Sequence, residues 1–134
     1  QVGEGTADRP AEAQGNRPIA AWLDEQETRC DYLLMIADYH MSEWTRRCLR
    51  HADRVLYVGN AATGAVSNPV EAYLEAHAHQ VSQPVRELAL LQPRNAPASS
   101  AHDWLNHYQV YRHHHLRCGS HSDAARLARQ LTGN

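Results

Sequence analysis

Residues 31–60 read DYLLMIADYHMSEWTRRCLRHADRVLYVGN, and this stretch decides the fold. It contains two uninterrupted apolar runs, Tyr32–Ala37 and Val55–Val58, separated by a short segment with a helical pattern. Apolar runs without polar alternation are typical of strands that are buried on both faces of a sheet. A helical crossover between two such strands predicts a βαβ unit with a parallel strand pair.

The two runs end on residues that suit a binding site. Asp38 follows the first run, and Gly59 and Asn60 follow the second. The carboxyl ends of parallel strands open on one edge of a sheet, where α/β folds bind ligands. These three residues are therefore candidates for a crevice that would bind a nucleotide or another small anion, with Asp38 placed to hold magnesium. A capping or turn role is the favoured interpretation of Asp38.

Helical and strand-like patterns keep alternating outward from this stretch. Helices are expected at residues 18–30, 42–52, 68–81, 101–108 and 122–133. Strands are expected at residues 32–37, 55–58, 87–92 and 110–116. The last strand is the most polar, which places it nearer an edge. Strict alternation predicts an α/β fold: a three-layer sandwich with a mainly parallel sheet of about four strands, Rossmann-like or like a degenerate P-loop fold.

Capping residues set the expected helix ends. Ser42 is expected to cap the crossover helix, and Pro69 to open the helix after it. Ser122 is expected to cap the last helix, and Gly133 to end it. The crossover helix is expected to pack on the sheet through its apolar stripe, Trp44, Cys48, Leu49 and Ala52. Its opposite stripe is expected to face solvent through Arg46, Arg47 and Arg50.

Length and composition predict one folded domain. The chain has 134 residues, of which 43% are hydrophobic and 21% charged. We expect residues 1–17 to form a flexible lead-in, and residues 18–134 a single α/β domain. The sequence contains neither a membrane span nor a signal-peptide pattern, so a cytoplasmic location is expected. The cysteines lack any C-x-x-C spacing and read as reduced thiols: Cys30, Cys48 and Cys118.

The charged residues exclude several classes of function. The net charge is −2, and protonating all ten histidines would move it to −2 + 10 = +8. Every basic residue is arginine, which excludes a P-loop lysine, a Schiff-base lysine and a catalytic lysine base. The arginines are scattered rather than gathered in a stripe, which argues against nucleic-acid binding.

Two short motifs approach known catalytic patterns and fail. Residues 59–64 have the G-x-x-x-x-G spacing of a phosphate-binding loop, but Ala65 and Val66 stand where lysine and serine or threonine are required. Residues 119–122 read GSHS, which lacks the G-x-S-x-G turn of a serine hydrolase. We therefore predict no catalytic residue and no cofactor.

The histidine run at residues 113–115 is the candidate metal site. His113 and His115 share one face of the predicted strand and could ligate one ion, with His77 and His79 as further ligands. No acidic residue is near the run in sequence. A solvent-facing or hydrogen-bonding cluster is therefore the favoured interpretation, because edge strands tolerate polar side chains, and we predict no metal.

Several of these segments together resemble a known family. They are SEWTRRCLRHADRVLYVGNA at residues 42–61, ELALLQP, the Trp104-Leu105 segment and HHHLR. At their relative spacings they resemble the region just before the catalytic domain in the neuropathy target esterase family of patatin-like phospholipases. The resemblance covers residues 19–133, and it is most specific from Trp44 to Gly59.

The resemblance implies a non-catalytic regulatory or scaffolding domain within a longer serine esterase that acts on phospholipids or lysophospholipids. It would link cyclic-nucleotide-binding-like domains to the hydrolase domain, with membrane proximity through the parent. A degenerate nucleotide- or anion-binding module is the alternative. A looser resemblance to ParA/MinD-type folds, at Asp38 and at the Ala52-Asp53 pair, implies a domain truncated at its N-terminus. Its free sheet edge would allow a homodimer.

Overall fold

The computed structural model describes residues 16–79, 83–95 and 99–133. They fall into two compact units, one with residues 16–52 and 69–79, the other with residues 53–68, 83–95 and 99–133. Most of the predicted lead-in and the end of the predicted helix at 68–81 lie outside the described residues.

A parallel three-stranded sheet forms the centre of the second unit. Its strands are β1 (Arg54–Asn60), β2 (Val85–Gln92) and β3 (Arg112–Arg117), in the order β1-β2-β3. Both strand pairs are parallel. This arrangement confirms the predicted α/β fold and the edge position of the polar strand.

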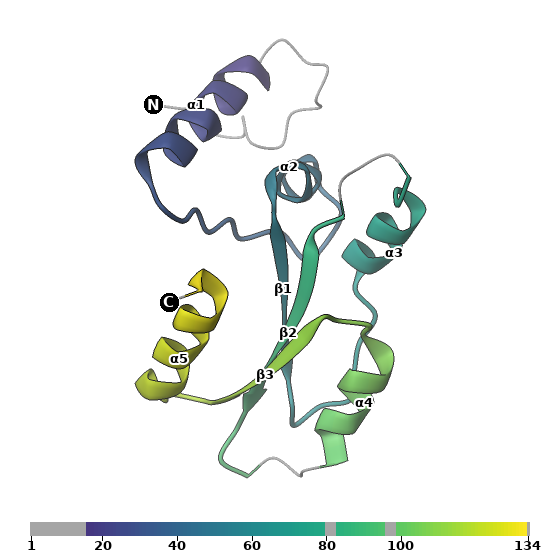
Figure 1. The fold of residues 1–134 in the computed structure, drawn as a ribbon. Coiled ribbons are helices and arrows are strands. Elements are labelled where there is room, and N and C mark those ends of the chain that lie inside the picture. Colours follow the sequence, from purple (N-terminus) through teal and green to yellow (C-terminus); the bar gives the residue numbers. More distant parts are fainter. Residues whose placement is uncertain (1–15, 80–82, 96–98, 134) are drawn as a thin grey trace. The chain divides into compact units, whose positions relative to one another are not determined.

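Helices cover both faces of this sheet (Figure 1). The register aligns Tyr57, Leu88 and His113 on one face, which α4 (Ser99–His107) covers. Val58, Ala89 and His114 align on the other face, where α5 (His121–Thr132) packs on β3. The three predicted layers are therefore present within this unit.

Apolar burial on the central strand holds the layers together. Leu88 and Leu90 are fully buried on β2, on the face that also carries Tyr57 and Gly59 of β1. Burying a leucine side chain stabilises a fold by about 1.5–3 kcal/mol. The uninterrupted ELALL run therefore marks the middle of the sheet, as its lack of polar alternation indicated.

Three helices make up the first unit: α1 (Asn16–Arg29), α2 (Glu43–His51) and α3 (Pro69–Ala76). Ile19 and Leu23 are the buried positions of α1, whereas Trp22 is exposed. Pro69 opens α3, as expected from its preset φ angle. None of the helices in the described part of the chain is long and apolar enough to cross a membrane.

The crossover helix begins where the sequence predicted and buries a residue that the sequence placed in solvent. Ser42 caps α2, because its side-chain oxygen accepts a hydrogen bond from the Thr45 N–H at 3.1 Å. Cys48 and Leu49 are buried, as predicted. The prediction for Arg47 was wrong: only 2% of it is exposed. Burial, followed by the nearby charge of Arg50, lowers the pKa of Arg47.

The first apolar run does not form the predicted strand. Residues 32–37 carry no strand assignment, and Leu34 is 85% exposed. Side chains of α2 bind the backbone at the end of this run: the Trp44 Nε1–H donates to the Ile36 carbonyl at 2.8 Å, and the Asp38 N–H donates to Thr45 Oγ1 at 3.1 Å. The described sheet therefore has three strands rather than about four.

The last helix starts earlier than predicted and ends as predicted. Ser120, not Ser122, is the N-cap of α5, because its side-chain oxygen accepts from the Asp123 N–H at 3.2 Å. Gly133 has φ = 75°, and its N–H donates to the Arg129 carbonyl. A left-handed glycine at this position is a common helix terminator, because glycine has no Cβ to clash.

Candidate functional site

The loop after β1 is the place where the sequence predicted a ligand crevice. Asn60 closes a turn there: its side-chain Oδ1 accepts from the Ala62 N–H at 2.9 Å, and its carbonyl accepts from the Thr63 N–H at 3.1 Å. The Ala61 N–H donates to the Leu91 carbonyl at 2.8 Å. The backbone donors of residues 61–63 are therefore all used within the chain.

Gly59 lies against the indole ring of Trp104. A Cβ atom at Gly59 would lie only 2.8 Å from Trp104 Cζ3, a distance that real Cβ contacts do not reach. Glycine is therefore required at this position for close packing between β1 and α4. The same indole donates its Nε1–H to the Thr63 carbonyl at 2.8 Å. Trp104 thus closes the start of the loop from one side.

Two more side chains contact the rest of this loop: Tyr108, which follows α4, and Asp103, which lies within α4. The Tyr108 hydroxyl donates to the Val66 carbonyl, and its ring lies 5.0 Å from that of Tyr57 and 5.6 Å from that of Trp104. A Cβ atom at Gly64 would lie 3.3 Å from Asp103 Oδ2. A carboxylate next to the loop repels anions, so this part of the predicted crevice disfavours phosphate.

Asp38 belongs to the first unit, and Gly59 and Asn60 belong to the second. Within its own unit, Asp38 accepts a hydrogen bond of 2.5 Å from the Ser42 hydroxyl. Ser42 is the N-cap of α2, so the carboxylate supports a helix start, where a negative charge is stabilised by the helix dipole. This geometry matches the capping role that the sequence analysis favoured for Asp38.

The histidine run divides between two faces of β3. His113 and His115 are exposed and share one face, with ring centroids 5.3 Å apart. His115 Nδ1 lies 3.1 Å from Gln92 Nε2. Partial desolvation of its ring, followed by the charges of the other two histidines, lowers the pKa of His115. His77 and His79, the further ligands considered, belong to the other unit.

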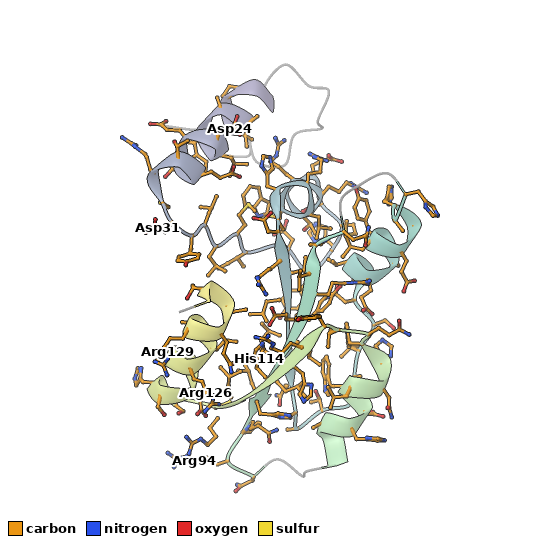
Figure 2. All side chains as sticks on the ribbon, viewed as in Figure 1. Asp24, Asp31, Arg94, His114, Arg126 and Arg129 are labelled. Carbon is orange, nitrogen blue, oxygen red and sulfur yellow. The ribbon has the colours of Figure 1, made fainter. Side chains whose placement is uncertain are left out.

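The middle histidine of the run joins a buried hydrogen-bonded cluster that the sequence analysis missed. His114 Nε2 lies 2.6 Å from Glu87 Oε2, and its Nδ1 lies 3.0 Å from Gln130 Oε1. Arg54 donates to the other oxygen of Glu87. Figure 2 shows His114 between the sheet and α5. The burial of His114 could have been predicted from the sequence. His114 and the apolar Leu116 lie two residues apart on β3, so their side chains share the inward face.

A second cluster anchors the start of α5. Asp123 is buried and accepts hydrogen bonds from the Arg117 N–H and Nε–H, both at 2.9 Å. Arg126, which projects from α5 in Figure 2, lies 3.1 Å from the same carboxylate. The Arg117 side-chain hydrogen bond is the main cause that holds the pKa of Asp123 well below its usual range. The S-x-x-D spacing of residues 120–123 could have predicted that Ser120 caps the helix and that Asp123 lies in its first turn.

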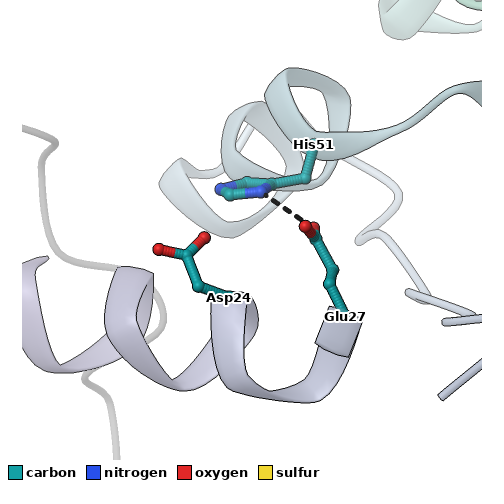
Figure 3. A group of neighbouring side chains, drawn as sticks. All are labelled: Asp24, Glu27 and His51. Carbon is teal, nitrogen blue, oxygen red and sulfur yellow. Dashed lines mark hydrogen bonds and ion pairs between the residues drawn. The ribbon is translucent and has the colours of Figure 1, made fainter. Parts of the chain in front are cut away.

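Asp24, Glu27 and His51 form a further group that the sequence analysis did not identify (Figure 3). Asp24 and Glu27 lie one turn apart on α1, and His51 is the last residue of α2. Glu27 Oε1 lies 3.3 Å from His51 Nδ1. Twenty-four residues separate this pair in the sequence, and no local pattern predicts contacts over that distance.

This group is the one set of three metal-binding side chains within mutual reach in the described ranges. One donor atom from each lies within 4.8 Å of the others. Zinc bonds of about 2.1 Å require donor atoms at most about 4.2 Å apart, so the exposed carboxylates would have to close in around an ion. The ion pair alone explains the present geometry, in which His51 joins the end of α2 to α1.

The parallel sheet between helical layers, with a glycine-spaced loop after β1, places the second unit in the class of P-loop-like α/β domains. Comparison with known families gives the same class. The profile of the "Neuropathy Target Esterase family P-loop like domain" matches residues 11–133. The chain therefore belongs to the neuropathy target esterase family, as the resemblance predicted.

Two curated relatives illustrate the match. The proteins named "Neuropathy target esterase sws" from Drosophila virilis and Drosophila melanogaster are each 32% identical to the chain over 151 residues. Each alignment covers 92% of this chain and 10% of the relative, so the chain spans about a tenth of the length of these relatives. No solved structure matches the chain significantly.

Proposed function

We propose that this chain is a non-catalytic scaffolding domain of a longer esterase of the neuropathy target esterase family. It would link sensor domains, similar to cyclic-nucleotide-binding domains, to a hydrolase domain that acts on phospholipid or lysophospholipid esters. The names of the relatives support an esterase as the parent. The location would be cytoplasmic, with membrane proximity through the parent.

The observation that carries the proposal is the state of the loop after β1. A phosphate-binding loop points free backbone N–H groups at its ligand. Here the N–H groups of residues 61–63 bond to Leu91 and Asn60 of the same chain. Asp103 adds a negative charge beside Gly64. The P-loop-like fold thus retains the spacing of a phosphate loop, but its backbone donors bond to β2 and to Asn60, and its Thr63 carbonyl accepts from Trp104 of α4.

The direct test is an esterase assay on the purified chain. Lysophosphatidylcholine and p-nitrophenyl butyrate would serve as substrates, with and without a fluorophosphonate that blocks catalytic serines. We expect no turnover above the buffer control. Turnover that the fluorophosphonate abolishes would show that the chain carries its own nucleophile, and would contradict the proposal.

A thermal-shift measurement distinguishes the scaffold from the anion-binding module. Ligands that bind only the native state raise the melting temperature by mass action. We expect ATP, GTP, cyclic AMP and cyclic GMP to leave the melting temperature unchanged. A rise of several degrees with any one of them favours the binding module. The variant Asp103→Asn removes the repelling carboxylate, so it would strengthen such a rise if the loop were the binding site.

A positive test uses the complete parent protein. If this domain acts as a scaffold, Trp104→Ala in the parent lowers the amount of folded, active esterase. The KM of the molecules that remain active stays unchanged, because no residue of the domain touches substrate. Asp103→Asn is the matched control on the same helix and should leave both quantities at the wild-type level. A raised KM in the Trp104→Ala parent would contradict the scaffold role.

A further inference from the structure

The two edges of the sheet are not equivalent, and β1 forms one of them. The Val85 N–H of β2 donates to the Asp53 carbonyl, and the Ala61 N–H donates to the Leu91 carbonyl. Backbone groups alternate in direction along a strand, so the odd-numbered residues of β1 bond to β2. The N–H and C=O groups of Leu56 and Val58 therefore point away from the sheet. Among the described residues, no turn, loop or cap hydrogen bond involves these outward groups.

Side chains distinguish the β1 edge from the β3 edge. Val58 is 61% exposed, and Leu56 beside it on the same face is partly exposed. The single charged residue of β1, Arg54, is bound to Glu87. On β3 the exposed positions are instead basic or imidazole side chains: Arg112, His113, His115 and Arg117. Charges protect an edge strand from pairing with another strand, and β1 lacks that protection.

The β1 sequence is complementary to itself when two copies run antiparallel. A two-fold axis at Tyr57 places Leu56 opposite Val58 of the second copy, and Arg54 opposite Asn60 of the second copy. These pairs join residues whose backbone groups point outward, so each pair can exchange both N–H···O bonds. Apolar cross-strand pairs add about 0.2–1 kcal/mol each relative to alanine pairs. No like charges face each other in this register.

The β3 edge lacks this apolar self-complementarity. The Cys118 N–H donates to the Gln92 carbonyl of β2, so the odd-numbered residues of β3 carry the outward-pointing backbone groups. A two-fold axis at His115 would place His113 opposite Arg117 of the second copy, and none of these outward positions is apolar. The side-chain pattern thus favours the β1 edge over the β3 edge as the surface where two copies meet.

We propose that β1 pairs antiparallel with β1 of a second copy, so that two three-stranded sheets join into one six-stranded sheet. The contact is isologous, because both copies contribute the same residues around a two-fold axis. The free N–H and C=O groups of Leu56 and Val58 become bonded, and Val58 gains an apolar neighbour. This assembly depends on the second unit alone and stands apart from the proposed scaffolding function.

The test uses a substitution that blocks only the outer edge. Val58→Pro removes the outward N–H, while the bonds from β1 to β2 use other residues, and proline is tolerated on edge strands. Val58→Thr is the matched control, because it keeps the N–H and the β-branched shape. Sedimentation from ~1 µM to ~1 mM spans the affinities of modest interfaces. We expect twice the 15.1 kDa chain mass for wild type and Val58→Thr, and 15.1 kDa for Val58→Pro.

Amide exchange supplies a second readout that does not depend on how well the proline variant folds. In the wild-type chain, the amides of Leu56 and Val58 should exchange quickly at low concentration and slowly at high concentration. The amide of Tyr57, which faces β2, should be protected at both. The proposal is overturned by a mass of 15.1 kDa at every concentration, by a dimer that persists in folded Val58→Pro, or by a dimer that leaves the amides of Leu56 and Val58 unprotected.

Discussion

Glu87 Oε2 lies 2.6 Å from Nε2 of His114, and both side chains are almost fully buried, at 1% and 7% exposure. Because Arg54 donates to the other oxygen of Glu87, one carboxylate on β2 links a residue of β1 to a residue of β3. A buried carboxylate is costly unless it is hydrogen-bonded, and here the partners of Glu87 lie on both neighbouring strands. This cluster therefore fixes the relative register of the sheet as well as its stability.

Replacing His114 alone should lower the free energy of unfolding more than replacing Glu87 and His114 together. His114→Leu leaves a buried carboxylate with one partner fewer, so we expect the free energy of unfolding to fall by about 1–3 kcal/mol. The double substitution Glu87→Leu with His114→Leu removes both groups and should recover much of that loss. Urea unfolding followed by circular dichroism measures both values. His113→Leu is the exposed control, expected within about 0.5 kcal/mol of wild type.

Acid should reveal the contribution of Asp123. The Arg117 hydrogen bonds hold the pKa of this carboxyl below its unfolded value of about 3.9. A depressed folded-state pKa stabilises the native state above the unfolded pKa, and this contribution is lost as the pH falls toward the folded value. Asp123→Asn should therefore be less stable than wild type at pH 7, and the difference should shrink below about pH 4. A difference that stays constant from pH 7 to pH 3 would contradict this assignment.

A strand formed where an apolar run also had another strand to pair with. The run ending at Val58 and the ELALL run pair with each other in the structure. The Tyr32–Ala37 run is also apolar throughout, yet it carries no strand assignment. An apolar run records that a segment prefers burial, but a strand also requires a partner for its backbone groups. Periodicity contains no information about that partner.

Buried polar residues were the second source of error. Arg47 was placed in solvent, and no buried partners were predicted for Glu87 or His114, yet all three are buried. Their burial depends on partners that are distant in sequence, as in the Glu87–His114 pair, which spans 27 residues. Local signals did better where the cause is local, since the Ser42 cap and the terminal Gly133 were predicted correctly.

Thiol reactivity should separate the three cysteines. Burial, followed by the nearby Asp38 charge, raises the pKa of Cys48 to about 11. At pH 8 only about one Cys48 in a thousand is then a thiolate, the reactive form. Cys30 and Cys118 are exposed. A short N-ethylmaleimide pulse with mass spectrometry should add two labels to the native chain and three in urea. Rapid labelling of native Cys48 would contradict its burial.

Metal removal tests the Asp24, Glu27 and His51 group. If the group is only an ion pair between helices, EDTA should leave the melting temperature of the purified chain unchanged. His51→Ala should then lower the free energy of unfolding by no more than about 1 kcal/mol, the usual range of exposed ion pairs. Calorimetry with zinc gives the complementary readout. Zinc binding that His51→Ala abolishes, while His113→Ala with His115→Ala does not, would show that the group holds a metal.

The contact between Gly59 and Trp104 makes the sharpest prediction about the loop after β1. Gly59→Ala places a methyl group 2.8 Å from the indole, so overpacking should cost about 1–3 kcal/mol. Gly64→Ala is the matched control in the same loop, because its methyl group would meet only the Asp103 side chain, at 3.3 Å. Gly64→Ala should therefore lower the free energy of unfolding by less than Gly59→Ala does.

A double-mutant cycle then isolates this contact from other effects of alanine. Trp104→Leu is destabilising by itself, since it loses the hydrogen bond to the Thr63 carbonyl and the stacking with Tyr108. It also makes room for a methyl group, so Gly59→Ala should cost less in the Trp104→Leu background than in wild type, with a coupling energy of about 0.5–3 kcal/mol. Additive costs would mean that the indole does not limit position 59, and that another property of alanine causes the destabilisation.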